Sequence, residues 1–232
     1  MNLVSYADRS VQAEQLAQLV ASELQKAVQS QGKASAAFAG GTTPVLFFQA
    51  LSKQAVDWSK LTFTLTDERQ VEPTHERSNA RLLTEHLLAK LPVPAHFQAL
   101  YQVGQTATEL ASLSLSLQQQ LFPLEVVVLG MGNDGHFASL FPQAPNLAAG
   151  LDPHYPDVLL EVRVADLPEA RISMSLAALL QAKHVHLLIT GADKKQLLEQ
   201  AQAHIAAHRP AQWPIEALLQ QAGDSLMVHY AP

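Results

Sequence analysis

The sequence contains no cysteine, which excludes disulfide frameworks, zinc–thiolate sites and thiol nucleophiles. Its first residues lack the basic segment and long apolar stretch that mark a secretory signal. No uninterrupted apolar run approaches the roughly 18–20 residues that a membrane span needs. Charged residues make up only 16% of the chain and the formal net charge is −6, whereas nucleic-acid binders usually carry a basic excess. We therefore expect a cytoplasmic protein that binds neither nucleic acid nor membrane.

Apolar residues, in contrast, make up 48% of the 232 residues, which is enough for a sizeable core. This length allows one large α/β domain or two small ones. The sequence shows no internal repeat, low-complexity tract or domain linker. We therefore predict a single domain over residues 1–232, and we expect it to act as a monomer.

Segments with strand-like and helix-like patterns alternate along the chain. The predicted strands are 34–39, 61–66, 126–129, 159–164, 185–190 and 226–230. The predicted helices are 10–30, a helix that starts at Pro44 with Thr42 or Thr43 as its cap, 77–90, 105–121, 171–182 and 192–203. This alternation predicts an α/β fold with a mainly parallel sheet and helices on both faces.

Four polar or glycine-rich segments directly follow predicted strands. They are AGGTTP, TDER, GMGNDGH and TGADKK. Because ligands bind beyond the carboxyl ends of strands in open parallel sheets, we expect a binding site where these segments meet. In the first of them, Gly40 and Gly41 would let backbone N–H groups approach an anion. An ordinary strand-to-helix turn with a threonine cap is the plainer alternative.

The segment VVVLGMGNDGHFASLFP, residues 126–142, contains G-x-G-x-x-G after a strand. Pro142 follows Gly135 too closely for the long helix of a dinucleotide site, so we set that reading aside. Imidazole titrates near neutrality, so His136 is a candidate general base, with Asp134 two residues before it. Asp67, at the end of another strand, could orient His136 or contact the substrate. A structural histidine and a solvated charge cluster at 67–69 are the alternatives.

Two cations are expected near helix starts, Arg171 at the first residue of a helix and Lys194 within TGADKK. A cation there opposes the helix dipole, which is easier to understand if an anion lies between the cation and the exposed N–H groups. Solvated surface charges are the alternative. The pairs His204/His208 and His184/His186 have spacings that could hold a metal, but no further ligands accompany them, so we predict no metal site.

At this point the sequence resembles a known family. FAGGTTPVLFFQAL, TDERQV with HERSNARLL, VLGMGNDGHFASLFP, RISMSL and LITGADKK look like the ordered motifs of bacterial 6-phosphogluconolactonases and, more widely, of the group that includes glucosamine-6-phosphate deaminases. The resemblance implies a Rossmann-like α/β fold and cofactor-free hydrolysis of 6-phospho-glucono-1,5-lactone, the second step of the oxidative pentose phosphate pathway.

The resemblance also implies roles for individual residues. His136 is the expected general base, and Arg171 and Lys194 are the expected phosphate ligands. The segments Gly40-Gly41-Thr42 and Asp67 to Arg69 are expected to line the same pocket.

Two other functions remain open at this stage. A deaminase of the same group usually carries an acidic residue shortly after the histidine, where this chain has Ser139-Leu140-Phe141-Pro142. A sugar-phosphate-binding regulator usually carries an additional DNA-binding region, for which 232 residues with a net charge of −6 leave no room.

Overall fold

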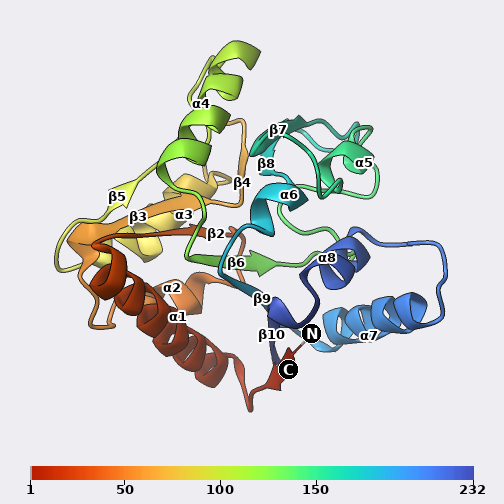
Figure 1. Cartoon of the computed structure of the whole chain (residues 1–232), viewed down its shortest axis with the longest axis horizontal. Helices are drawn as coiled ribbons and strands as arrows, with labels where there is room; N and C mark the ends of the chain where they lie inside the picture. The colour runs from red at the N-terminus through yellow and green to blue at the C-terminus, as the bar shows by residue number, and fades with distance from the viewer. Residues whose placement is uncertain (1) are drawn as a thin grey trace.

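The computed structural model describes residues 2–232 and contains two sheets, one large and one small (Figure 1). The large sheet has seven strands in the order β1-β10-β9-β6-β2-β3-β5, and every neighbouring pair is parallel. In chain order its strands are β1 (Asn2–Ser5), β2 (Ala34–Phe38), β3 (Leu61–Leu65), β5 (His96–Phe97), β6 (Val126–Gly130), β9 (His184–Thr190) and β10 (Leu226–Ala231). The prediction of an α/β fold with a mainly parallel sheet is confirmed.

Helices flank the large sheet. The helices of residues 2–232 are α1 (Arg9–Gln31), α2 (Val45–Leu51), α3 (Asn79–His86), α4 (Ala107–Gln120), α5 (Leu147–Gly150), α6 (Leu176–Leu179), α7 (Ala192–Ala206) and α8 (Pro214–Ala222). In Figure 1, α1 and α2 lie together to one side of the sheet, whereas α7 and α8 lie to the other. The two termini lie close together because β1 pairs with the final strand, β10.

The sequence explains why α1 forms and where it ends. The Asp8 carboxylate caps the helix by accepting hydrogen bonds from the N–H groups of Ser10 and Val11. One stripe of the helix, including Leu16 and Leu24, is fully buried against the sheet. Gly32 ends the helix in a left-handed conformation, with φ of 77°. The helix thereby covers β2, β6 and β10.

A second, antiparallel sheet was not predicted from the sequence. It has the strand order β4-β8-β7 and consists of β4 (Asp67–Arg69), β8 (Arg171–Met174) and β7 (Leu159–Val162). The predicted helix over 171–182 is therefore wrong in its first part, because pairing with β4 and β7 on both sides fixes Arg171 in a strand. Only the segment from Leu176 is helical, in α6.

Other differences from the prediction are local. Neither Thr42 nor Thr43 caps α2, whose N-cap is Pro44 and makes no side-chain hydrogen bond. Strands β1 and β5 and helices α5 and α8 were not predicted. Within residues 2–232, no helix combines the length and apolar character that crossing a bilayer requires.

Candidate active site

The segment that follows β6 carries the candidate base on a compact turn. Residues 131–146 form turns and bends without any helix, which agrees with setting aside the dinucleotide reading. The N–H of Gly135 donates to the carbonyl of Gly132 at 3.1 Å, and the N–H of Gly132 donates to the carbonyl of His136 at 2.9 Å. These two bonds close the turn, so that His136 stands at the carboxyl end of the central strand.

Asp134 holds the imidazole of His136 in place. Asp134 Oδ1 lies 2.5 Å from His136 Nδ1 and also accepts the backbone N–H of His136 at 3.2 Å. The ring lies directly over Gly132, where any Cβ would collide with it, so only glycine fits there. Burial tends to raise the pKa of Asp134, but the hydrogen bond and positive charge of His136 outweigh this effect and leave the pKa below its ordinary value. Asp134 therefore stays ionised at neutral pH and keeps the proton on Nδ1.

A cavity of about 330 Å³ opens in front of the His136 ring. Almost every residue that the sequence predicted for the site lines this cavity. Its lining includes Gly40, Gly41, Thr42, Asp67, Arg69, His136, Arg171 and Lys194. Asp134 stands behind His136 and does not line the cavity. The carboxyl ends of β2, β6 and β9 and the small sheet thus converge on one site.

Two arginines lie side by side on one wall of this cavity. Arg69 and Arg171 are directly opposite each other in the antiparallel pairing of β4 and β8. Like charges in such a pair repel each other, so the arrangement destabilises the empty protein. The Nε atoms of both arginines are buried and have no hydrogen-bond partner among the described residues. A bound anion would relieve the repulsion and satisfy these donors.

The charges on Arg171 and Lys194 are only weakly compensated. Burial and the repulsion of Arg69 lower the pKa of Arg171, and its closest carboxylate oxygen, on Glu169, is 4.0 Å away. Burial, followed by the charge of Arg9, lowers the pKa of Lys194. Lys194 lies in the first turn of α7, as predicted, and forms no ion pair within residues 2–232. Arg171 lines the same cavity from a strand, so the helix-dipole argument does not apply to it.

The loop between β2 and α2 adds neutral donors. The backbone N–H groups of Gly40, Gly41 and Thr42 donate to no other residue in the described part of the chain. All three residues line the cavity, and none of these N–H groups has an acceptor among the described residues. Backbone donors of this kind stabilise a developing oxyanion at little cost in reorganisation.

Asp67 does not orient His136. Its carboxylate accepts hydrogen bonds from the hydroxyl groups of Ser139, at 2.6 Å, and Thr66, at 3.3 Å. The backbone N–H of Ser139 in turn donates to the hydroxyl of Ser173 at 3.1 Å. Asp67 therefore ties the segment after His136 to the small sheet, and Asp134 takes the orienting position.

Sequence reasoning missed two residues that shape the site. The ring of Phe141 packs against the imidazole of His136, with 4.3 Å between centroids, and the Arg171 guanidinium lies over the same ring, 5.8 Å from its centroid. Glu68 is buried and accepts the N–H groups of Arg69, Asn79 and Ala80, which anchors α3 beside the cavity. Burial is the main cause that raises the pKa of Glu68 above its ordinary value. The DER motif pointed to Asp67 and Arg69, but its central carboxylate gave no sign of this role.

A larger cavity, of about 720 Å³, lies at the opposite edge of the sheet. It is lined mainly by neutral polar side chains, and its buried carboxylate, Glu125, is already paired with Lys183 at 2.7 Å. We place the chemistry in the smaller cavity because the histidine–carboxylate pair and the weakly compensated cations meet there. Among residues 2–232, no group of three or more acidic or histidine side chains could hold a metal ion.

Comparison with known proteins decides the family. The model of the family described as glucosamine-6-phosphate isomerases/6-phosphogluconolactonase matches residues 7–227. This chain belongs to that family. The 6-phosphogluconolactonase of Rhizobium meliloti is 40% identical over 232 residues, covering 100% of this chain and 99% of the relative. That of Neisseria meningitidis serogroup B is 37% identical, covering 97% of each.

Solved structures of family members agree with this assignment. The crystal structure of a 6-phosphogluconolactonase from Shewanella baltica superposes with a TM-score of 0.91 at 35% identity, covering 100% of this chain and 98% of the other. The cavity beside His136 is therefore a feature of a chain whose family includes lactonases and isomerases.

Proposed function

We propose that this enzyme is a 6-phosphogluconolactonase that hydrolyses 6-phospho-D-glucono-1,5-lactone to 6-phospho-D-gluconate, the second step of the oxidative pentose phosphate pathway. The names of its relatives support the reaction. One observation supports the mechanism: the histidine of a histidine–carboxylate pair lines a cavity together with weakly compensated cations and with residues whose N–H groups have no acceptor among the described residues.

In the proposed mechanism, Nε2 of His136 takes a proton from a water molecule while the water oxygen attacks C1 of the lactone. Asp134 keeps Nδ1 protonated and stabilises the imidazolium that forms. The carbonyl oxygen becomes an oxyanion, which backbone N–H groups at Gly40 to Thr42 would stabilise. When the intermediate collapses, the C1–O5 bond breaks and the imidazolium returns its proton to O5, giving a carboxylic acid and an alcohol.

The remaining cations supply the phosphate site in this proposal. Arg69, Arg171 and Lys194 would bind the 6-phosphate, which is doubly charged near neutral pH. A guanidinium that reaches a phosphate through two donors forms a strong, oriented contact. Binding at that end would hold C1 at a fixed distance from His136, which turns a bimolecular attack into a positioned one.

The deaminase alternative lacks a second acid–base group beside the candidate base. None of Phe137, Ala138, Ser139, Leu140 or Phe141 titrates near neutral pH. The position next to the imidazole is filled by the Phe141 ring, and the Asp67 carboxylate already holds two hydroxyl groups. Opening a hemiacetal, moving a proton between carbons and expelling an amine would require more groups than this.

One experiment tests the proposed function directly. Freshly generated 6-phosphogluconolactone is supplied to the purified protein, and its disappearance is compared with the fast spontaneous hydrolysis. Ammonia release from glucosamine 6-phosphate is measured in parallel on the same preparation. We expect lactone hydrolysis well above background and no ammonia. Steady ammonia production without lactonase activity would assign the chain to the other branch of its family.

A further inference from the structure

The turn that carries Asp134 and His136 is supported from behind by a distant part of the chain. The N–H of Ile215, at the start of α8, donates to the carbonyl of Gly135 at 2.9 Å. Trp213 covers the Cα atom of Gly135 so closely that an added Cβ would lie 2.7 Å from Cβ of Trp213 and 3.2 Å from its Cγ. Gly135 itself has φ of 77°, a conformation that favours glycine.

Trp213 is in turn held by two polar side chains. Glu216 Oε1 accepts the N–H groups of Gln212, at 3.0 Å, and Trp213, at 3.3 Å. The ring of His204, from α7, packs against the indole with 5.1 Å between centroids. These contacts fix the loop between α7 and α8 at the place where it meets the turn.

The support comes at a cost in stability. Glu216 is fully buried, and its Oε2 has no hydrogen-bond partner among the described residues. Nδ1 of His204 is 3.8 Å from Oε1 and likewise has no hydrogen bond among the described residues. Buried polar atoms are normally satisfied, so an exception calls for an explanation. We infer that these unsatisfied atoms are tolerated because Glu216 fixes the loop at Trp213, which supports the turn that carries His136.

We propose that Trp213 is a positioning residue for His136, acting through Gly135. The inference rests on the proposed role of His136 as the base. Trp213 does not line the cavity, so we expect no direct contact between its indole and the substrate. Without the indole, Gly135 gains room to move, and the imidazole between Asp134 and the attacking water moves with it. Displacement by about 1 Å can lower the rate of a positioned reaction by up to about 10²-fold.

The contact atoms suggest a matched pair of variants. The Trp213 side-chain atoms nearest to a Cβ built on Gly135 are Cβ, Cγ and Cδ1, all of which phenylalanine also has. Trp213→Phe therefore keeps the support, whereas Trp213→Ala removes all of it beyond Cβ. Leu219→Ala serves as the stability control, because Leu219 is a buried residue of the adjacent helix α8 that does not line the cavity.

The three variants and His136→Ala are compared in the lactone assay, at a temperature where thermal unfolding shows each to be folded. We expect Trp213→Ala to lower kcat about tenfold while KM stays close to that of the parent. The acid side of its pH–rate profile should also move, because the contact between Asp134 and His136 is loosened. Trp213→Phe should recover most of the rate, and Leu219→Ala should keep it.

Three outcomes overturn the proposal. If Trp213→Ala keeps its kcat while His136→Ala loses it, Trp213 has no positioning role and the proposed base stands. If Leu219→Ala loses as much rate as Trp213→Ala, the effect is one of general stability. If His136→Ala itself keeps the rate, the proposed base is wrong, and the inference about Trp213 falls with it.

Discussion

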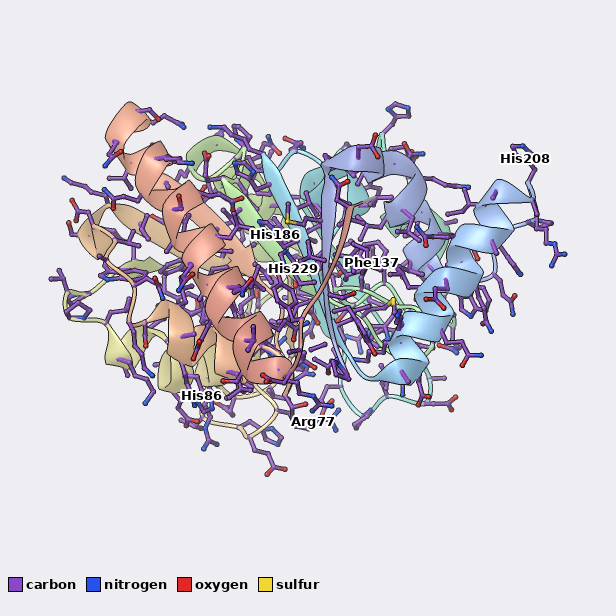
Figure 2. All side chains as sticks on the ribbon, turned by 90° about the horizontal axis from the view of Figure 1, so that it is seen from below. Arg77, His86, Phe137, His186, His208 and His229 are labelled. Carbon is purple, nitrogen blue, oxygen red and sulfur yellow. The ribbon has the colours of Figure 1, made fainter. Side chains whose placement is uncertain are left out.

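Two of the histidine–carboxylate pairs in the molecule lie in very different surroundings. In the first, His136 and Asp134 are 2.5 Å apart, with 28% and 39% of their side chains exposed. In the second, His186 and Glu23 are 3.0 Å apart, with only 2% and 10% exposed. Figure 2 shows His186 close to His229 in the interior of the molecule. The same chemical groups are present at an open turn and in a closed core.

The second pair belongs to a chain of hydrogen bonds that runs from Glu23 through His186 and His229 to Tyr6. His186 Nδ1 lies 3.0 Å from His229 Nε2, and His229 Nδ1 lies 2.7 Å from the hydroxyl of Tyr6. Both nitrogens of each ring are therefore occupied, so neither ring can take a proton from water. His136 uses one ring nitrogen for Asp134 and, within residues 2–232, leaves Nε2 without a partner at the cavity. A free nitrogen beside a cavity, rather than the pairing itself, distinguishes a candidate base from a structural histidine.

The largest expected effect comes from removing the first pair. His136→Ala should lower kcat by about 10²–10⁴-fold, the usual loss for a general base, while the protein remains folded. His186→Gln is the contrasting variant, which should lose stability and keep kcat. Steady-state kinetics and chemical unfolding of both variants test this. Near-parental turnover of His136→Ala would mean that another group activates the water.

His229, which contacts the His186 ring of the second pair, should control the dependence of stability on pH. Burial and, to a lesser degree, the neighbouring His186 lower the pKa of His229 to about 3, whereas an unfolded histidine titrates near 6.5. The unfolded chain therefore binds this proton first. The contribution of His229 to stability is complete above about pH 6.5 and is lost as the pH falls towards 3, by as much as about 4 kcal/mol.

The free energy of unfolding, measured in urea between pH 7 and 4, tests this expectation. His229→Gln removes the titrating group, so its stability should fall less steeply with acid than that of the parent. Exposed His96 provides the control, and His96→Gln should follow the parental curve. Parallel curves for the parent and His229→Gln would show that His229 is not the group responsible.

The next effect concerns the weakly compensated cations of the cavity beside His136. Arg171→Ala should weaken the binding of 6-phosphogluconate about 10- to 100-fold, the range expected for losing a hydrogen bond to a charged group. Added inorganic phosphate should compete with the ligand in the parent protein. Arg163→Ala is the control, since Arg163 is exposed and already pairs with Glu161 at 2.5 Å. An unchanged affinity of Arg171→Ala in calorimetry would remove Arg171 from the proposed phosphate site.

These two regions also show what the sequence could predict. Helix α1 and strand β6 were predicted because their apolar patterns are local, and glycine-rich segments marked the carboxyl edge of the sheet. The pairing of β4 with β8 was missed because it joins residues 67–69 to residues about a hundred positions later. Arg171 was placed in the cavity correctly, but on a helix where there is a strand. The contact of Trp213 with Gly135 is tertiary and has no local signal. The catalytic and binding roles of the site residues remain predictions.

The smallest expected effect concerns His184, a partly exposed histidine that also contacts Glu23 of the second pair. His184 lies 3.4 Å from Glu23 and 3.9 Å from Glu125, but 43% of its side chain is exposed. Both carboxylates keep other partners, because Glu23 still contacts His186 and Glu125 still contacts Lys183 at 2.7 Å. Exposed ion pairs contribute little, so His184→Gln should lower stability by about 0.5 kcal/mol or less and leave kcat unchanged. Urea unfolding at low and high salt measures this, and salt should abolish the difference. If His184→Gln is destabilised as strongly as His186→Gln, then Glu23 depends on both rings, and the buried pair is not a separate unit.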